Sequence, residues 1–238
     1  MRNDNYLQAH DVGLRDPNCP ASSEQNSFYL QVGKRVLDVV ASLLGLLVAS
    51  PALLLCAIAI WLDSRGPIWY RQWRVGQQGK PFQILKLRSM VQNADQKGLK
   101  LTAAGDTRIT RVGRWLRKTK LDEVPQLLNV LRAEMSLVGP RPEVPEYVAT
   151  YGPEQREVLK FRPGITGPAS LTFIDEEEWL AAQPNQKDFY INSILVRKLA
   201  LDLCYCRQVT FWGDMKLILG TIGALFISTK KSGGASQV

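Results

Sequence analysis

The sequence predicts a mostly helical α+β protein, in which one long apolar segment precedes a small soluble domain with a β-hairpin and amphipathic helices. Three observations predict this class. Residues Val39 to Leu62 carry no charge. The segments IWYRQWRV and PFQILKLRSM, rich in aromatic and β-branched residues, flank the turn-forming GQQGK. Later segments alternate helical periodicity with loops rich in proline and glycine.

Composition divides the chain into four segments. Residues 1–33 are rich in Asn, Asp, Gln and Ser and are predicted to form a polar, mobile tail. Residues 34–64 contain the apolar helix and residues 65–228 the soluble domain, while residues 229–238 are expected to be a flexible C-terminal tail. A length of 238 residues fits one globular domain with an anchor.

The apolar segment is long enough to cross a membrane. As one helix, Val39–Leu62 would measure about 36 Å at about 1.5 Å per residue, against a hydrocarbon core of about 30 Å. Pro51, preceded by Ser50, lies at its centre, where proline disfavours a regular helix. The pattern leaves a kinked span and a re-entrant hairpin open. Basic residues at both ends, with Lys34 and Arg35 before the run, fit both ends remaining on the cytoplasmic face.

The soluble part begins with the predicted hairpin and continues as short helices. Helices are expected over VQNADQKG, ITRVGRWLRKTK and LDEVPQLLNVLRAEM, the last with an apolar face made by Leu127, Leu128 and Leu131. MSLVGPRPEVP and FRPGITGPAS are predicted to be loops, because their prolines and glycines oppose regular structure.

Two apolar helices are predicted toward the C-terminus. FYINSILVRKLALDLC repeats Ile191, Leu195, Leu199 and Leu203 at every fourth residue, which favours a core helix over an interfacial one. TFWGDMKLILGTIGALF carries Trp212 near its start and few charges, so packing in the core and lying on a membrane are equally supported.

The charge distribution indicates a polyanionic partner. The net charge is +8, but Asp63 to Lys120 alone holds fourteen Lys/Arg against three Asp/Glu, a local excess of +11. Nucleic acid, an anionic membrane surface and a nucleotide substrate all suit such a block. The four cysteines form no CxxC pair and the single histidine, His10, lies in the polar tail. A zinc site and a histidine-based triad are therefore poorly supported, and a reducing compartment is favoured.

Asp122 and Glu123, in TKLDEVPQ, stand directly after this basic block. Thr119 with Asp122 resembles a capping box and Pro125 suits a first turn, so the acids are predicted at a helix start. They can serve stability there, since the helix dipole favours anions. Alternatively, a carboxylate kept ionised by the dipole and nearby cations is a nucleophile or a magnesium ligand. Acids and arginines without a nearby histidine are the groups that phosphoryl transfer uses.

These motifs resemble the bacterial sugar transferases, the monotopic phosphoglycosyl transferases, in their minimal catalytic-domain form. The matching segments are KRVLDVV with the later Ser-Pro, FQILKLRSM, DTRITRVGRWLRKTKLDEVPQLLNVLRAEMSLVGPRP and FRPGITGPAS. The resemblance implies transfer of a sugar 1-phosphate from a UDP-sugar to polyprenyl (undecaprenyl) phosphate, with release of UMP and with Mg²⁺ as cofactor. Asp122 would form a covalent phosphosugar intermediate, and Asp122 and Glu123 would be the metal ligands. Glu123 would position Asp122, hold the metal or assist proton removal.

The resemblance also suggests phosphate contacts. Arg141 in GPRPEVP matches the family's Pro-Arg-Pro signature, and the flanking prolines would fix its backbone. Lys86 and Arg88 of KLRSM match a second shared element. Three arginines recur every third residue and are expected to share one helix face toward lipid headgroups, substrate phosphates or solvent: Arg111, Arg114 and Arg117.

For the apolar segment, the resemblance implies a re-entrant helix broken at Ser50-Pro51, with Lys34 and Arg35 at the membrane interface. The protein is then expected on the cytoplasmic face of the bacterial inner membrane, where a soluble UDP-sugar and a lipid acceptor meet. It would begin the assembly of a capsule, lipopolysaccharide or other exopolysaccharide, with downstream glycosyltransferases as further partners and no nucleic acid.

Two other functions remain open on sequence, a membrane-tethered polyanion-binding module and a magnesium-dependent pyrophosphatase that uses the same acid pair. Few aromatic residues interleave the basic ones, which disfavours the first, and the apolar segment disfavours the second. One stretch departs from the family. PGITG is followed by PASLTFIDEEEW, where many relatives continue with Trp-Ala-Gln-Val-Asn-Gly-Arg, so the donor sugar does not follow from the resemblance.

Overall fold

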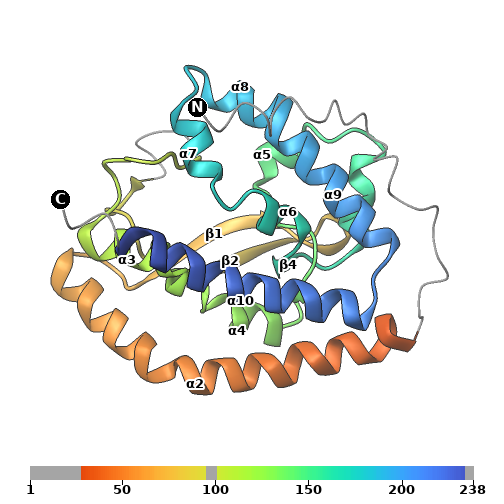
Figure 1. The fold of residues 1–238 in the computed structure, drawn as a ribbon, viewed down its shortest axis with the longest axis horizontal. Helices are drawn as coiled ribbons and strands as arrows, with labels where there is room; N and C mark the ends of the chain where they lie inside the picture. The colour runs from red at the N-terminus through yellow and green to blue at the C-terminus, as the bar shows by residue number, and fades with distance from the viewer. Residues whose placement is uncertain (1–27, 95–100, 234–238) are drawn as a thin grey trace.

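The computed structural model describes residues 28–94 and 101–233, and it confirms a mostly helical protein with little sheet (Figure 1). Strand β1 (Trp69–Val75) pairs with β2 (Pro81–Leu87), and β3 (Ser136–Val138) with β4 (Gly164–Thr166). The other described elements are helices and helical turns: η1 (Tyr29–Gly33), α2 (Lys34–Asp63), η2 (Gln77–Gly79), α3 (Arg111–Thr119), η4 (Leu121–Glu123), α4 (Gln126–Leu131), α5 (Pro145–Val148), η5 (Gln155–Lys160), α6 (Pro168–Thr172), α7 (Glu176–Ala181), α8 (Gln186–Phe189), η6 (Tyr190–Leu195), α9 (Val196–Arg207) and α10 (Phe211–Gly233).

Helix α2 is continuous through Pro51, which corrects the expected break at Ser50-Pro51. Pro51 has no N–H to donate to the carbonyl of Leu47, four residues earlier. The Ser50 hydroxyl donates to that carbonyl instead, over 2.8 Å, so the carbonyl keeps a donor. In Figure 1, α2 curves without breaking, and both of its ends rise toward the rest of the protein.

The N-terminal end of α2 is fastened to two other helices. Lys34 forms an ion pair with the buried Asp214 of α10. Arg35 donates to the carbonyl oxygens of Val130 over 2.6 Å and Leu131 over 2.9 Å, at the end of α4. These are the carbonyls that a helix C-terminus leaves without intrahelical donors, so Arg35 stabilises the end of α4.

The C-terminal end of α2 is fastened to the same body. Arg88, which follows β2, donates to the Ser64 carbonyl over 2.6 Å. Asp63 accepts a hydrogen bond from the Val112 N–H in the first turn of α3, over 3.1 Å. Both ends of this apolar helix therefore contact polar groups of one folded unit.

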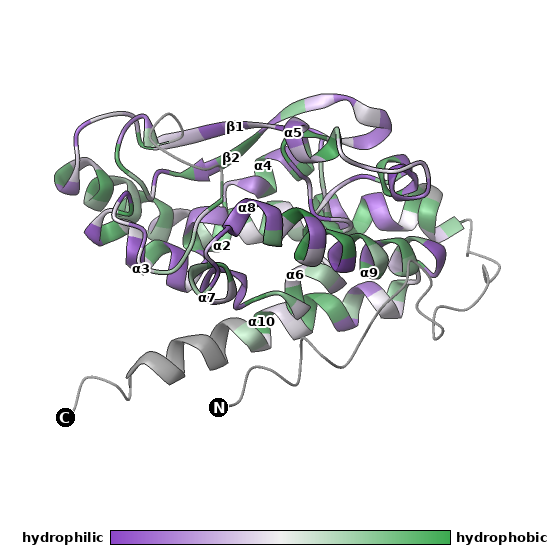
Figure 2. Cartoon of the chain, turned by 90° about the horizontal axis from the view of Figure 1, so that it is seen from above, coloured by the Kyte–Doolittle hydropathy of each residue, from purple (hydrophilic) through white to green (hydrophobic). Residues whose placement is uncertain are grey.

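Between its ends, α2 presents apolar side chains outward. Leu47 and Val48 are 71% and 80% exposed. The inner face packs on α4, where a Cβ at Gly45 would lie 3.0 Å from a methyl carbon of Leu127. On α10, along which hydrophobic residues recur in Figure 2, Trp212 is 79% exposed. Within the described residues, α2 alone is long and apolar enough to span a membrane.

The predicted β-hairpin is confirmed. Its antiparallel register sets Trp69 opposite Leu87 and Tyr70 opposite Lys86. Side chains alternate between the two faces of a strand. Tyr70 and Lys86 therefore project on one side of the hairpin, and both line the pocket described below.

The two segments predicted to be irregular loops pair with each other, so that prediction was wrong. Strands β3 and β4 are parallel, with Ser136 opposite Gly164. Glycine permits the close approach, because a Cβ at Gly139 would lie 2.5 Å from the carbonyl oxygen of Arg162. Proline and glycine weaken local structure but do not prevent two short stretches from pairing across the fold. The GPRP and PGITG segments thus form one unit.

Helix α3 confirms the prediction over ITRVGRWLRKTK, and the Thr110 hydroxyl caps it by accepting from the Gly113 N–H over 2.9 Å. The next helix is shorter than predicted, because the acid pair lies in the 3₁₀ turn η4 and α4 begins only at Gln126. The prediction of a capping box formed by Thr119 and Asp122 was wrong. The Thr119 hydroxyl donates back to the Trp115 carbonyl over 3.0 Å and belongs to the end of α3.

The largest core cluster surrounds η6 and α9, which confirms the core assignment of FYINSILVRKLALDLC. Its buried members from that segment are Tyr190, Ile194, Leu195, Leu199 and Leu203. On α4 the expected leucine face is only half-buried, whereas Asn129 is fully buried. Its side chain accepts from the Leu85 N–H over 3.0 Å and donates to the Gln83 carbonyl over 2.8 Å, so it joins α4 to β2.

Some predictions fall wholly or partly outside the described residues. The helix expected over VQNADQKG extends into residues 95–100, and residues 91–94 form a turn. Most of the predicted N-terminal tail, residues 1–27, and the end of the C-terminal one, residues 234–238, lie outside as well. Helix α10 extends to Gly233, inside the segment predicted to be a C-terminal tail.

Candidate active site

A pocket of about 700 Å³ opens between the β1–β2 hairpin and helices α6, α7 and α9. Nine Lys/Arg and five Asp/Glu side chains of the described residues line it, so it carries an excess of four positive charges. Two sides of the pocket are named here by their residues. The β wall comprises Lys86, Lys120, Asp122 and Glu123, and the α wall comprises Phe173, Glu176, Glu177, Tyr190 and Lys198.

Asp122, on the β wall, is 4% exposed. Its Oδ1 atom is buried and has no hydrogen-bond partner among the described residues. Burial raises the pKa of the Asp122 carboxyl above its ordinary value, and the adjacent charge of Glu123 raises it further. A buried acceptor without a donor costs free energy unless a ligand contacts it. Oδ1 therefore marks a place for a cation or for an electrophilic centre.

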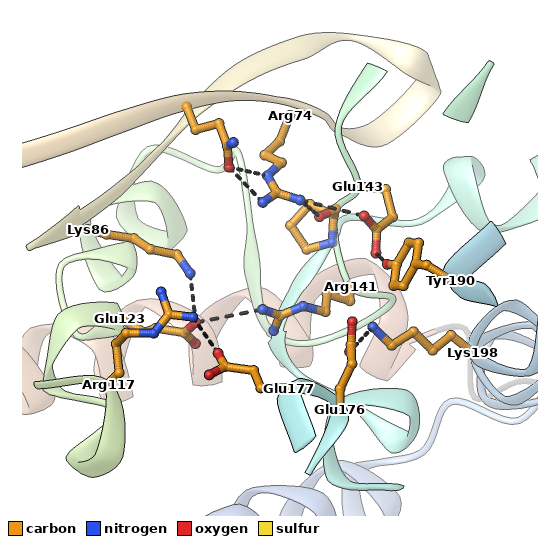
Figure 3. A network of polar contacts seen from close by, with 12 residues as sticks. Arg74, Lys86, Arg117, Glu123, Arg141, Glu143, Glu176, Glu177, Tyr190 and Lys198 are labelled. Atoms are coloured by element: carbon orange, nitrogen blue, oxygen red, sulfur yellow. Dashed lines mark hydrogen bonds and ion pairs between the residues drawn. The ribbon is translucent and has the colours of Figure 1, made fainter. Parts of the chain in front are cut away.

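Glu123 has the opposite environment. It accepts from Lys86 Nζ over 2.7 Å and lies 3.7 Å from a terminal nitrogen of Arg141 (Figure 3). Burial acts to raise the pKa of the Glu123 carboxyl, but the charges of Lys86, Arg141 and Lys120 together hold that pKa well below its ordinary value. The sequence predicted that a helix dipole and cations would keep Asp122 ionised. In the structure the cations act mainly on Glu123, because burial dominates at Asp122.

Arg141 reaches the β wall from the paired GPRP and PGITG segments. Its backbone N–H donates to Asp202 Oδ2 of α9 over 3.1 Å. Asp202 also accepts from the backbone of Ala169, at the start of α6, so one carboxylate joins both segments to the core helix. Burial raises the pKa of Asp202 to about 7. A backbone held in this way directs the Arg141 guanidinium into the pocket with little loss of entropy on binding.

Of the other residues predicted to contact phosphate, some line the pocket and others lie outside it. Arg117 lines the pocket and forms an ion pair with Glu177, whereas Arg111 and Arg114 are exposed and do not line it. Arg88 is buried at the pocket edge, where it contacts the end of α2. The three arginines of α3 therefore do not form one substrate-binding face, because only Arg117 lines the pocket.

The four residues predicted for membrane anchoring lie away from the pocket. Lys34 and Arg35 contact α10 and α4, and Ser50 compensates for Pro51 within α2, as described above. None of the four is among the residues that line the pocket.

Sequence reasoning missed the α wall and the network behind it. Glu176 forms an ion pair with Lys198, and the Tyr190 hydroxyl donates to Glu143 over 2.6 Å (Figure 3). Glu143 in turn lies 3.6 Å from a guanidinium nitrogen of Arg74 on β1. These groups are far apart in the chain. The one available signal was the Asp-Glu-Glu-Glu run in the stretch that departs from the family pattern.

The carboxylates of the acid pair fit Mg²⁺ if the substrate supplies further oxygen ligands. Among the described residues, no cluster of three or more His, Cys, Asp or Glu side chains could hold a metal ion by itself. Mg²⁺ commonly binds one or two carboxylates together with substrate phosphates and waters. The Asp122 Oδ1 atom, buried and without a partner in this part of the chain, is such a ligand. The residues therefore fit a magnesium ion shared with a phosphate-bearing substrate.

Comparison with known proteins gives concordant results. A sequence profile of the bacterial sugar transferases matches residues 29–228. The chain is 42% identical over 195 residues to a UDP-glucose:undecaprenyl-phosphate glucose-1-phosphate transferase of Caulobacter vibrioides, covering 81% of this chain and 69% of the relative. It is 39% identical over 204 residues to an undecaprenyl-phosphate glucose phosphotransferase of Komagataeibacter xylinus, covering 79% and 35%.

A third relative, from Aeromonas hydrophila, is a UDP-N-acetylgalactosamine-undecaprenyl-phosphate N-acetylgalactosaminephosphotransferase, with 36% identity over 194 residues, or 79% of this chain and 42% of the relative. The chain thus spans less than half of two of these three proteins. The part of this chain that the family profile matches, residues 29–228, includes the acid pair, the GPRP segment and helix α2. On this evidence, the chain belongs to the bacterial sugar transferase family.

Proposed function

We propose that this protein transfers a sugar 1-phosphate from a UDP-sugar to polyprenyl phosphate and releases UMP. The observation that carries the proposal is Asp122. Its carboxylate is buried in a positively charged pocket, and one oxygen has no partner within the described structure. The three relatives named above act on UDP-sugars or on undecaprenyl phosphate according to their names, which supports this substrate pair.

The reaction proceeds in two displacements at the same phosphorus. In the first, an Asp122 carboxylate oxygen attacks the phosphorus that bears the sugar, and the bond to the UMP oxygen breaks. In the second, a phosphate oxygen of the lipid attacks the aspartyl phosphosugar. The acyl-phosphate bond then breaks, which restores the carboxylate and gives a sugar joined to the lipid through a diphosphate. The first displacement needs a nucleophile in the buried, cationic part of the pocket, and Asp122 meets that need. In the second displacement the lipid phosphate is the nucleophile and Asp122 is the leaving group.

Glu123 holds two cations, Lys86 and Arg141, close to Asp122. Because Lys86 and Arg141 both contact Glu123, their charges stay beside Asp122 when no substrate is bound. They are then in place to stabilise the charge that develops on the phosphoryl oxygens, without reorganisation during the reaction. Of the roles expected for Glu123, positioning is the one that these contacts favour.

Magnesium has a defined place in this proposal. Asp122 Oδ1, with phosphate oxygens of the donor, would hold the ion, which when bound neutralises diphosphate charge. Glu123 is engaged with Lys86, so we assign it a smaller share of the metal site than the sequence suggested.

Membrane attachment on one face follows from α2. Both of its ends contact polar groups of one body, while side chains between them are exposed and apolar. A helix of this kind can enter one leaflet and return, but it cannot place its ends on opposite sides of a bilayer without breaking those contacts. We therefore propose that α2 lies in the cytoplasmic leaflet of the inner membrane as a bent helix.

Leu127 of α4, Leu171 of α6 and Ala224 of α10 also line the pocket, and we call these three residues its apolar end. Leu127 also contacts α2 at Gly45, so a single side chain separates the membrane helix from the pocket. The first isoprene units of a lipid phosphate fit this end, with the phosphate directed at the β wall. The product would then enter glycan assembly at the membrane.

The proposal is tested by separating the two half-reactions. The purified full chain is incubated with a panel of UDP-sugars and Mg²⁺ without lipid, then quenched rapidly and examined by intact-mass spectrometry. We expect a mass increase of one sugar phosphate and one equivalent of UMP, both absent in Asp122→Asn. Glu157→Gln, which changes an exposed carboxylate paired with Lys160, is the matched control and should behave as the parent.

Three results would contradict the proposal. They are lipid product without any adduct on Asp122, turnover by Asp122→Asn, and continued release of UMP with free sugar phosphate in the absence of lipid. The last outcome would favour a pyrophosphatase.

The membrane arrangement needs its own test. Single cysteines replace Phe28 and Arg65, exposed residues at the two ends of α2, in a variant whose native cysteines are serine. A membrane-impermeant thiol reagent added to spheroplasts should reach neither cysteine, and added to inverted vesicles it should reach both. Labelling of the two positions from opposite sides would rule out the monotopic arrangement.

A further inference from the structure

Lys120 has an unusual backbone conformation next to the acid pair. Its φ and ψ angles are 55° and 16°, in the left-handed region, and its N–H donates to the carbonyls of Leu116 and Arg117. This is the position after a helix at which glycine, or less often asparagine, avoids steric strain. Its carbonyl accepts from the Glu123 N–H over 3.1 Å, so Lys120 joins α3 to the turn that carries Asp122.

The side chain of Lys120 differs from those of three other cations that line the pocket. Lys86 contacts Glu123, Arg117 contacts Glu177, and Lys198 contacts Glu176. Lys120 lines the same pocket and has no hydrogen bond or ion pair of its side chain within the described part of the chain. Its charge acts on both acids, since it lowers the pKa of Asp122 and of Glu123, although less than Lys86 does in each case.

A purely structural role would not explain a lysine here. Closing α3 in this conformation requires only a backbone, and glycine would provide it with less strain. A strained residue that lines a pocket is more readily explained by what its side chain does there. The pocket has an excess of four positive charges, and an ammonium group that pairs with no neighbouring carboxylate in the described structure can accept a new anion without first losing an old partner.

We propose that Lys120 is a phosphate-binding residue of the reaction, whose ammonium group contacts the phosphate that approaches Asp122. The identity of this phosphate rests on the proposed function. The contact between Lys120 and a phosphate does not depend on it. That phosphate is either the diphosphate of the UDP-sugar or the phosphate of the lipid. The two have the same chemistry at Lys120, and kinetics separates them.

Two substitutions separate backbone strain from charge. Lys120→Gly removes the ammonium group and relieves the strain, whereas Lys120→Gln removes the charge and keeps most of the side-chain length and the strain. Gln78→Gly is the matched control, because Gln78 is also left-handed, with φ 57°, but lies in the exposed hairpin turn outside the pocket. If Lys120→Gly does not fold, Lys120→Gln still decides the question.

We expect Lys120→Gly and Gln78→Gly both to keep or raise the Tm, since each relieves a left-handed residue. Only the Lys120 variants should lose activity, with kcat/KM falling about 10-fold to 100-fold, the effect of losing one hydrogen bond between charged groups. In a two-step reaction through an enzyme-bound intermediate, kcat/KM for each substrate reports its own half-reaction. A loss confined to the UDP-sugar places the contact on the donor, and a loss confined to polyprenyl phosphate places it on the acceptor.

A binding measurement keeps this inference separate from the proposed function. Inorganic pyrophosphate with Mg²⁺ is titrated calorimetrically into the parent, Lys120→Gln and Gln78→Gly. If the parent turns over and Lys120→Gln keeps both kcat/KM values, the inference is wrong while the proposed function stands. If the parent proves inactive as a transferase, weaker pyrophosphate binding in Lys120→Gln alone still supports the phosphate contact, and equal binding in all three proteins overturns it.

Discussion

The two walls of the pocket use charge in different ways. On the β wall, Lys86 and Arg141 both contact Glu123, and Oδ1 of the adjacent Asp122 has no hydrogen-bond partner among the described residues. On the α wall, Glu176 pairs with Lys198, and Glu177 pairs across the pocket with Arg117. The β wall therefore has one reactive group left over, whereas the acids of the α wall are neutralised. We infer that chemistry occurs at the β wall and that the α wall recognises the remainder of the substrate.

The largest effect is expected from Glu123→Gln, which breaks the arrangement of the β wall. The amide cannot balance Lys86 and Arg141, so these cations should move toward Asp122 and lower its nucleophilicity. We predict a fall in kcat of about 10²-fold to 10³-fold with little change in donor KM, in line with the loss of a preorganised electrostatic group. Steady-state release of UMP measures both constants. A kcat within 2-fold of the parent value would exclude a role for Glu123 in positioning Lys86 and Arg141 for the reaction.

Arg141→Lys should have the next largest effect. It keeps the positive charge but loses the planar fork of donors that grips phosphate oxygens in two places. We expect a decrease in kcat/KM for the UDP-sugar of about 10-fold to 100-fold. The matched control is Arg111→Lys, an exposed position outside the pocket, which should leave kcat/KM unchanged. Equal losses in the two variants would indicate a general effect of surface charge.

A change on the α wall should act mainly on binding. Glu176→Gln leaves Lys198 without its carboxylate partner, beside the rings of Phe173 and Tyr190. We predict a change of about 10-fold or less in donor KM, a nearly constant kcat, and an altered ranking of UDP-sugars in a competition assay. Glu178→Gln, exposed on the same helix, is the control. A loss of kcat comparable to that of Glu123→Gln would contradict the division between the walls.

Asp202→Asn should affect stability more than activity. Burial raises the pKa of Asp202 from 3.8 to about 7, so the folded state takes up a proton that the unfolded state does not hold between these values. The resulting stability is complete below about pH 4 and is lost as the pH rises through about 7. The parent Tm should therefore decline between pH 5 and pH 8 by several degrees more than that of the variant, at about 2–4 °C per kcal/mol. Parallel declines in the two proteins would exclude Asp202 as the cause.

The β wall was largely predictable from sequence, and the reason is its short range. The acid pair, α3 and the β-hairpin each depend on neighbouring residues, so local patterns identified them. Asp122 and Glu123 were singled out together, but their unequal environments depend on Lys86 and Arg141, which lie elsewhere in the chain. Burial at Asp122, not proximity to a helix end, decides its pKa, and burial is a property of the whole fold.

The α wall could not be predicted, because its contacts join distant segments. Tyr190 meets Glu143, 47 residues away, and Glu177 meets Arg117, 60 residues away. The pairing of β3 with β4 could not be predicted either, because it also joins segments that are distant in the chain. Gly139 and Gly164 look like loop residues locally, yet it is their lack of side chains that allows two backbones to meet.

The fastening of α2 has a consequence for how the protein is made. Lys34 and its partner Asp214 are separated by 180 residues. At roughly 5–20 residues per second, a ribosome needs roughly 10–40 s to synthesise the second after the first. The apolar helix therefore emerges, and can meet lipid, well before the partner of Lys34 exists. The contact between Lys34 and Asp214 must be among the last to form, and a nascent chain stalled before α10 should hold this end of α2 through Arg35 and α4 without it.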